Sequence, residues 1–165
     1  MTKQSAACRA VLYLRLSRDD DNRGESESIQ NQRALLREYA ARQGFSVIDE
    51  YADDGWSGTS FDRPRFQDML RDMEQHRFDI VLVKDLSRLG RDYIQTGRYL
   101  ELVFPEHGVR LIAVNDGIDT ARADTDLAPF RNVVNEMYAR DTSRKIRSAL
   151  HAKMPVSYTH LTLPT

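Results

Sequence analysis

The stretch DIVLVK, residues 79–84, has apolar residues at all of its central positions. Continuous apolar runs of this length are typical of strands that are buried on both faces of a parallel sheet. Three other stretches favour β-structure and are predicted as strands: AVLYLRL at residues 10–16, and residues 45–51 and 109–114. These four strands are expected to form the central sheet of the fold.

Helices are predicted between the strands. Their apolar residues recur at helical spacing over residues 29–43, from Pro64 onward, over residues 93–103, and from Pro129 to about Lys153. Because strands and helices alternate, the sequence predicts an α/β fold with a mainly parallel sheet covered by helices. In such sheets the functional loops lie at the carboxyl ends of the strands. These loops follow Leu16, Tyr51, Lys84 and Val114.

Length and composition favour a single domain without a membrane segment. The chain has 165 residues and a formal net charge of −1, so any surface for nucleic acid must be a local basic patch. The only cysteine is Cys8, which excludes a disulfide within the chain and favours a reducing compartment. No apolar run approaches the ~20 residues of a membrane span, and the N-terminus lacks a signal-peptide core. We therefore expect a cytoplasmic protein.

The first strand carries polar residues where a core strand is usually apolar. Tyr13, Arg15 and Ser17 alternate along YLRLS and therefore point to the same side. A buried arginine is costly unless its charge is used or paired. The segment is either an edge strand with a solvated arginine or a core strand whose arginine charge is used or paired at a site that Tyr13 and Ser17 also face.

The segment KDLSRLGRD, residues 84–92, follows the buried third strand and places Arg88 and Arg91 three residues apart. On a helical turn this spacing lets both side chains face the same way. The guanidinium group suits phosphate because it donates two parallel hydrogen bonds and stays charged. A solvated helix start is the alternative, although helix N-termini ordinarily prefer acids.

Other candidate residues carry less information by themselves. Arg63 lies in a Gly/Ser/Asp loop, and Gln32 lies on the first turn of the first helix. The four histidines, His76, His107, His151 and His160, are scattered without metal-ligand spacing, so no metal site and no cofactor are predicted.

The last predicted helix changes character along its length. Its first half has an apolar face made of Phe130, Val133, Val134, Met137 and Tyr138. Its second half is basic, with Arg140, Arg144, Lys145, Arg147, His151 and Lys153. By itself this pattern fits a core helix with a solvated end.

Together these motifs resemble the resolvase–invertase family of serine recombinases, and especially its large transposon-type members. The resemblance covers about residues 9–153 and rests on six segments in order: YLRLS, SIQNQ, DDGWSGTSFDRPRF, VKDLSRLGRD, FPEHGVRLIAVNDGIDT and NEMYARDTSRKIR. It implies a resolvase-like three-layer α/β/α fold with a central sheet of four to five strands and a long C-terminal helix. It also implies metal-independent cleavage and rejoining of double-stranded DNA.

The resemblance also assigns roles to residues. Ser17 resembles the nucleophile that forms a 5′-phosphoserine linkage, and Arg15, Arg88 and Arg91 resemble the arginines around the scissile phosphate. Arg63 resembles a further arginine, Gln32 a supporting polar residue, and Tyr13 shares the face of Arg15. The implied DNA contacts are Arg140, Arg144, Lys145 and Arg147, on a helix that also forms a homodimer, with a tetramer in the synaptic complex.

One position departs from the family pattern. Small resolvases have an aspartate immediately before the arginine that matches Arg88, whereas this chain has Ser87. Transposon-type members share the KDLSR form, so the departure does not indicate inactivation. Asp85 is near in sequence, but on an extended chain its side chain would point elsewhere. The acid that assists proton transfer therefore stays open.

The sequence suggests three segments: a catalytic core over residues 1–128, a truncated interface helix over 129–154, and a non-native tail over 155–165. The tail PVSYTHLTLPT lacks charge and helical period, and a short natural terminus is the alternative. We expect the chain to fold and to bind DNA weakly, without recombining it alone. A nucleotide-binding module is a rival, but SRDDDNRGESE offers one glycine and consecutive aspartates that repel phosphate. A catalytically inactive regulatory fragment is the other rival.

Overall fold

The structure, a computed structural model, describes residues 6–16, 29–122 and 127–161. Its strands are β1 (Arg9–Leu16), β2 (Ser46–Asp54), β3 (Ile80–Val83), β4 (Arg110–Ala113) and β5 (Ile118–Asp119). Its helices are α1 (Ile29–Gln43), α2 (Pro64–Glu74), α3 (Leu86–Leu89), α4 (Tyr93–Arg98), the π-helix η3 (Tyr99–Val103), α5 (Phe104–Glu106) and α6 (Ala128–Leu161).

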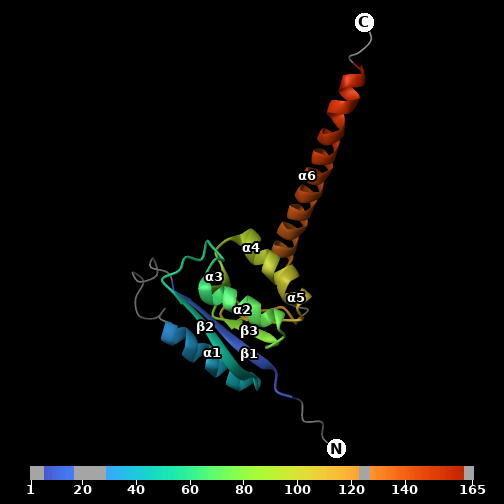
Figure 1. The fold of residues 1–165 in the computed structure, drawn as a ribbon. Coiled ribbons are helices and arrows are strands. Elements are labelled where there is room, and N and C mark those ends of the chain that lie inside the picture. The colour runs from blue at the N-terminus through green and yellow to red at the C-terminus, as the bar shows by residue number, and fades with distance from the viewer. Residues whose placement is uncertain (1–5, 17–28, 123–126, 162–165) are drawn as a thin grey trace, which may run out of the picture.

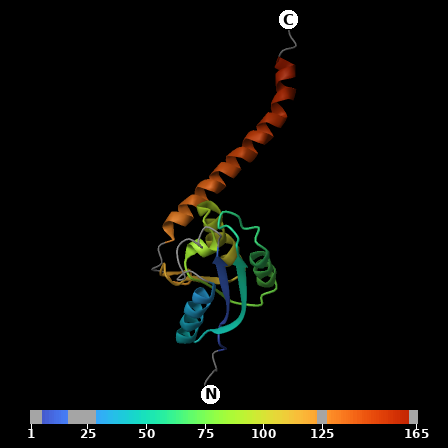
Figure 2. The ribbon, with the colours of Figure 1, turned by 90° about the vertical axis from the view of Figure 1, so that its left-hand side faces the viewer.

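The five strands form one sheet in the order β2-β1-β3-β4-β5. The first four are parallel to their neighbours, and β5 pairs antiparallel with β4. Helix α1 covers one face of the sheet and α2 covers the other, which gives three layers (Figures 1 and 2). The predicted α/β fold with a mainly parallel sheet of four to five strands is confirmed.

Strand β1 lies in the middle of the sheet and divides its side chains between two cores. Leu12 and Leu14 pack with Leu36 of α1, whereas Val11 and Tyr13 pack with Phe66 of α2. Arg15 follows Tyr13 in this alternation and is 0% exposed. The possibility that β1 is an edge strand with a solvated arginine is therefore wrong, because β2 and β3 flank it.

Several elements differ from the sequence prediction at their ends. Strand β2 continues to Asp54, three residues beyond the predicted end at Tyr51, because it pairs with β1 over its whole length. The helix predicted over residues 93–103 is divided into α4 and the π-helix η3 and continues as α5. The short helix α3 and strand β5 were not expected as separate elements.

Helix α6 begins beside α4 and then projects away from the body of the domain (Figures 1 and 2). Near its start, Phe130 stacks on Tyr93 with ring centroids 4.5 Å apart. The side chains of Val133, Val134, Met137 and Tyr138 lie outside the described set. The helix continues to Leu161, so the predicted end near Lys153 is wrong. A proline inside a helix removes one backbone hydrogen bond and crowds the carbonyl group of the preceding turn, yet the backbone is helical on both sides of Pro155.

Across the described ranges, none of the helices is both long enough and apolar enough to cross a membrane.

Candidate active site

Arg15, at the end of β1, is buried among backbone carbonyl groups. Its Nε donates to the carbonyl oxygen of Arg88 at 3.2 Å, and its Nη2 donates to that of Ser87 at 2.7 Å. Its Nη1 donates to the carbonyl oxygen of Trp56 at 3.0 Å. One planar guanidinium thus holds the turn after β3 and the loop after β2 against the end of β1, because its donors diverge in a fixed plane.

Arg63 holds the same turn from the other side and is also 0% exposed. Its Nη1 donates to the carbonyl oxygen of Arg88 at 3.2 Å, and its Nη2 donates to that of Leu89. Its guanidinium carbon lies 4.9 Å from the ring centroid of Phe66 and 5.0 Å from that of Phe61. The aromatic faces offset part of the cost of burying this charge, although burial still lowers the pKa of Arg63.

Tyr13 connects Arg63 to an aspartate that sequence reasoning missed. The Tyr13 hydroxyl accepts from Arg63 Nη1 at 2.7 Å and donates to Asp53 Oδ2 at 2.9 Å. Asp53 also accepts from the amides of Arg65 and Phe66, both at 3.0 Å, at the start of α2. Burial raises the pKa of the Tyr13 phenol, so the hydroxyl keeps its proton for this bond. A sequence signal existed, because Asp53 begins the DDGWSG motif.

Arg88 lies on α3 and is 3% exposed. Its Nη1 donates to the carbonyl oxygen of Arg15 at 3.2 Å, so the two arginines reach each other's backbone. Gln32 of α1 braces the same position, since its Nε2 donates to the Arg15 carbonyl at 3.0 Å and its Oε1 accepts from the Arg15 amide at 3.3 Å. The structure therefore brings Arg15, Gln32 and Arg88 together.

Asp85 was expected to point elsewhere, and that expectation is wrong. The chain turns into α3 directly after Asp85, so its carboxylate folds back over the turn. Its Oδ1 accepts from the Arg88 amide at 3.2 Å and from the Ser87 hydroxyl.

Arg91 differs from Arg88 in its surroundings. Helix α3 ends at Leu89 and Gly90 is extended, so the expected helical spacing of the two arginines does not apply. Arg91 is exposed, and its amide donates to the carbonyl oxygen of Gly58 at 2.7 Å. A Cβ at Gly58 would lie 2.8 Å from Arg91 Cγ and 2.9 Å from Arg15 Nη2. A side chain at position 58 would therefore push against both arginines.

Ser17 lies outside the described residues. Leu16, its neighbour in the sequence, is the last residue of β1.

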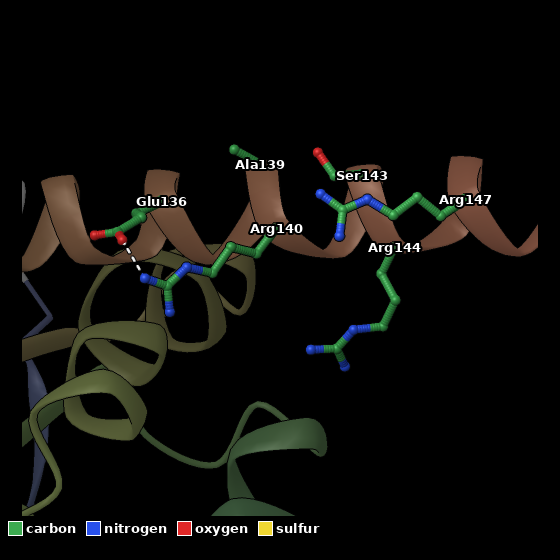
Figure 3. A pocket seen from close by; sticks show the side chains of 6 residues that line it. All are labelled: Glu136, Ala139, Arg140, Ser143, Arg144 and Arg147. Carbon is green, nitrogen blue, oxygen red and sulfur yellow. Dashed lines mark hydrogen bonds and ion pairs between the residues drawn. The ribbon is translucent and has the colours of Figure 1, made fainter.

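The predicted DNA-contacting residues are exposed on the part of α6 that leaves the body of the domain: Arg140, Arg144, Lys145 and Arg147. Figure 3 shows Arg140, Arg144 and Arg147 with Ser143 and Glu136 along one open depression. Arg140 forms an ion pair with Glu136 at 2.5 Å. Arg140 and Arg144 extend from the helix toward the side where the other ribbons lie (Figure 3).

No group of His, Cys, Asp and Glu side chains that could hold a metal ion is found within the described part of the chain. The side chains at this end of β1 include the buried guanidinium groups of Arg15, Arg63 and Arg88, and positive charge of this kind suits an anion.

Known proteins share the sequence family and the fold of this chain. Residues 10–155 match the family described as the resolvase N-terminal domain. The N-terminal catalytic domain of TP901-1 integrase is 30% identical with a TM-score of 0.68, and the match covers 84% of this chain and 98% of that one. The catalytic domain of ISC1926 TnpA, an IS607-like serine recombinase, is 28% identical with a TM-score of 0.54, over 64% of this chain and 69% of that one.

A resolvase family site-specific recombinase from Streptococcus pneumoniae shares the fold at 23% identity and a TM-score of 0.61, over 89% of this chain and 99% of that one. The family match spans most of the sequence and includes every described side chain of the site. The chain therefore belongs to the resolvase family of serine recombinases, as a catalytic domain.

Proposed function

We propose that this domain cuts and rejoins double-stranded DNA in site-specific recombination, with Ser17 as the nucleophile. The observation that carries the proposal is the contact between Arg88 Nη1 and the carbonyl oxygen of Arg15 at 3.2 Å. It joins the arginine-bearing turn to the end of the strand that leads to Ser17. An arginine site of this kind fits the charge of a phosphodiester.

The proposed reaction is an exchange of phosphate esters. Ser17 Oγ forms a bond to phosphorus in line with the bond to the DNA 3′ oxygen, which breaks, and the serine proton ends on that oxygen. The product is a 5′-phosphoserine linkage and a free 3′-hydroxyl. Rejoining reverses these steps, so the covalent linkage preserves the ester and no ATP is consumed.

The proposed roles of the arginines differ with their burial. Arg91 is exposed and is suited to meet a phosphate that approaches from solvent. Arg15 and Arg63 donate hydrogen bonds to the carbonyl oxygens of Ser87, Arg88 and Leu89. They therefore hold the turn that carries Arg88 in position and add buried positive charge beneath it. Preorganised charge of this kind lowers the barrier, and one such donor is worth about 3–4 kcal/mol. We propose that this arrangement serves without a metal ion.

The proposed partners are double-stranded DNA and further copies of the same chain. Two duplexes must be cut on both strands, which requires four serines and therefore a tetramer built from dimers. Arg140, Arg144, Lys145 and Arg147 supply phosphate contacts along α6, which position the protein without reading sequence. We also propose a cytoplasmic location, because a single cysteine favours a reducing compartment.

The test uses the chain joined to a DNA-binding domain of known target, with plasmids that carry paired target sites. Ser17→Ala should abolish cleavage and the protein–DNA adduct, while the melting temperature stays unchanged. Ser46→Ala is the matched control, because Ser46 is exposed at the start of β2 and pairs with Arg9, at the opposite end of β1 from Arg15. Mass spectrometry of the trapped adduct should locate DNA on Ser17. An adduct on Tyr13, or cleavage by Ser17→Ala, would overturn the proposal in favour of another nucleophile. Absence of cleavage and of any adduct with the wild-type domain would favour an inactive regulator.

A further inference from the structure

The carboxylate of Asp85 contacts Arg88 at two places. Its Oδ1 accepts from the Arg88 amide at 3.2 Å, and its Oδ2 lies 3.9 Å from Arg88 Nε. We propose that Asp85 is a positioning residue that holds the Arg88 guanidinium for the cleavage step. This inference rests on the proposed function only for its kinetic test.

The electrostatic reason is the crowding of positive charge around Arg88. The Arg88 side chain is 4% exposed, so water screens it little. Arg15 Nε and Arg63 Nη1 both donate to the Arg88 carbonyl oxygen, each at 3.2 Å, which brings two further buried cations to the same residue. Buried like charges repel strongly, and an acid beside them offsets that repulsion. Asp85 is placed to supply this negative charge.

The position of the carboxylate is itself fixed. The Ser87 hydroxyl donates to Asp85 Oδ1, and the Ser87 carbonyl oxygen accepts from Arg15 Nη2 at 2.7 Å. The Asp85 side chain is 21% exposed and caps α3. Its rotation is restricted by the Ser87 hydroxyl, the Arg88 amide and the Arg88 guanidinium, which lie on one turn. A carboxylate held in this way binds the backbone amide of Arg88 and attracts its side chain.

The separation of 3.9 Å also matters for function. It lies at the long end of an ion pair, so the attraction orients the guanidinium without binding it as a close bidentate pair would. A phosphate can then compete for the same side chain when DNA arrives. Asp85 thereby sets the direction from which Arg88 meets the phosphate.

Two variants separate this role from helix capping. Asp85→Asn keeps an oxygen acceptor for the Arg88 amide and removes the charge. Asp92→Asn is the matched control, since Asp92 caps α4 through the amides of Ile94 at 3.0 Å and Gln95 at 3.1 Å. Asp92→Asn should retain the wild-type melting temperature within a few degrees, whereas Asp85→Asn should lower it, because it removes the charge that offsets repulsion among the buried arginines.

The first measurement is independent of activity. In the NMR spectrum of the free chain, Asp85→Asn should shift the Nε–Hε resonance of Arg88, whereas Asp92→Asn should leave it in place. An unchanged Arg88 resonance would overturn the inference even if the proposed function holds. Should Asp85→Asn fail to fold, Ser87→Ala takes its place with the same criterion, because it releases the carboxylate.

The second measurement is single-turnover cleavage by the chain joined to a DNA-binding domain. Asp85→Asn should lower the rate by about 10-fold to 100-fold, as expected when a transition-state donor is misplaced. In an Arg88→Lys background the same substitution should change the rate by less than about 2-fold, because the group that Asp85 positions is gone. An equal loss in both backgrounds would show that Asp85 acts apart from Arg88. Absence of cleavage by the wild-type domain would instead count against the proposed function, and the NMR result would still decide the role of Asp85.

Discussion

The guanidinium of Arg15 donates a hydrogen bond to the carbonyl oxygen of Ser87 at 2.7 Å, across the gap between the end of β1 and the turn that carries Arg88. With its bonds to the carbonyl oxygens of Arg88 and Trp56, this side chain ties two loops to the central strand. The geometry of the turn therefore depends on a residue more than 70 positions away in the sequence.

Substitution of Arg15 by lysine should weaken the fold although it keeps the charge. A lysine ammonium is a point charge that cannot serve three carbonyl oxygens in the plane of a guanidinium. Arg15→Lys should lower the free energy of unfolding by about 3 kcal/mol and the melting temperature by about 6–12 °C. Arg42→Lys on the exposed side of α1 is the control and should melt like the wild type. Equal melting of the two variants would show that the carbonyl contacts are not structural.

Alanine variants of Arg91 and Arg88 should differ in their free energy of unfolding. Arg91→Ala removes an exposed side chain, so the free energy of unfolding should stay within about 0.5 kcal/mol of wild type. Its cleavage rate should fall by about 10²-fold or more if the guanidinium meets the phosphate. Arg88→Ala should lower both quantities, because Arg88 is buried. Thermal melting and single-turnover cleavage measure the two effects, and wild-type cleavage by Arg91→Ala would remove this residue from the site.

The ring of Phe61 leaves no room for a side chain at position 90, which is occupied by Gly90. A Cβ at position 90 would lie 2.2 Å from Phe61 Cζ, closer than any tolerated contact. Gly90→Ala should therefore lower the free energy of unfolding by about 1–3 kcal/mol, the usual cost of overpacking. In a Phe61→Leu background the cost of Gly90→Ala should shrink, since the clashing ring is absent. Denaturant unfolding of the four variants in this cycle tests the contact, and a cost that is the same in both backgrounds would contradict it.

Asp119 should make stability depend on pH in the acid range. Hydrogen bonds from Arg110, at 2.8 Å and 2.5 Å, hold the pKa of the Asp119 carboxyl below its usual value. Because the folded pKa lies below the unfolded value of about 3.9, the pair stabilises the fold fully above that value and loses its contribution as pH falls through the folded pKa.

The corresponding variant is Asp119→Asn. At about pH 7 it should lose about 2 kcal/mol of unfolding free energy, and the difference from wild type should narrow toward about pH 3. Melting curves across this range give the comparison. A difference that widens on acidification would have the wrong sign for a depressed pKa.

The arginines of α6 should govern the salt dependence of DNA binding. Each phosphate contact releases counterions, so loss of one arginine should reduce the slope of log K against log salt by about 1. Arg144→Ala and Arg147→Ala should show this reduction with any DNA sequence. Arg71→Ala on α2 is the control, because Arg71 is exposed and pairs with Asp68. A slope that is unchanged by the α6 variants and reduced by Arg71→Ala would place the DNA elsewhere.

The sequence by itself determined the layered α/β fold and the family. The apolar run of β3 and the alternation along β1 follow from local residue patterns, which is why they could be predicted. The expectation that Tyr13 and Arg15 share a face of β1 depended on the same alternation. Both side chains are buried, and Tyr13 packs with Phe66 of α2. The order of the motifs sufficed for the resolvase family, which the comparisons confirm.

Only the tertiary structure decided what each arginine touches. Arg15 and Arg63 look like phosphate ligands in the sequence, yet their donors reach the carbonyl oxygens of a turn that is distant in the chain. The orientation of Asp85 depended on α3, a single helical turn too short to leave a periodic pattern. Asp53 contacts Tyr13 and the first amides of α2 because β2 extends along β1 and ends beside the start of that helix. Contacts of this kind depend on which loops the sheet brings together, and local sequence patterns do not encode that pairing.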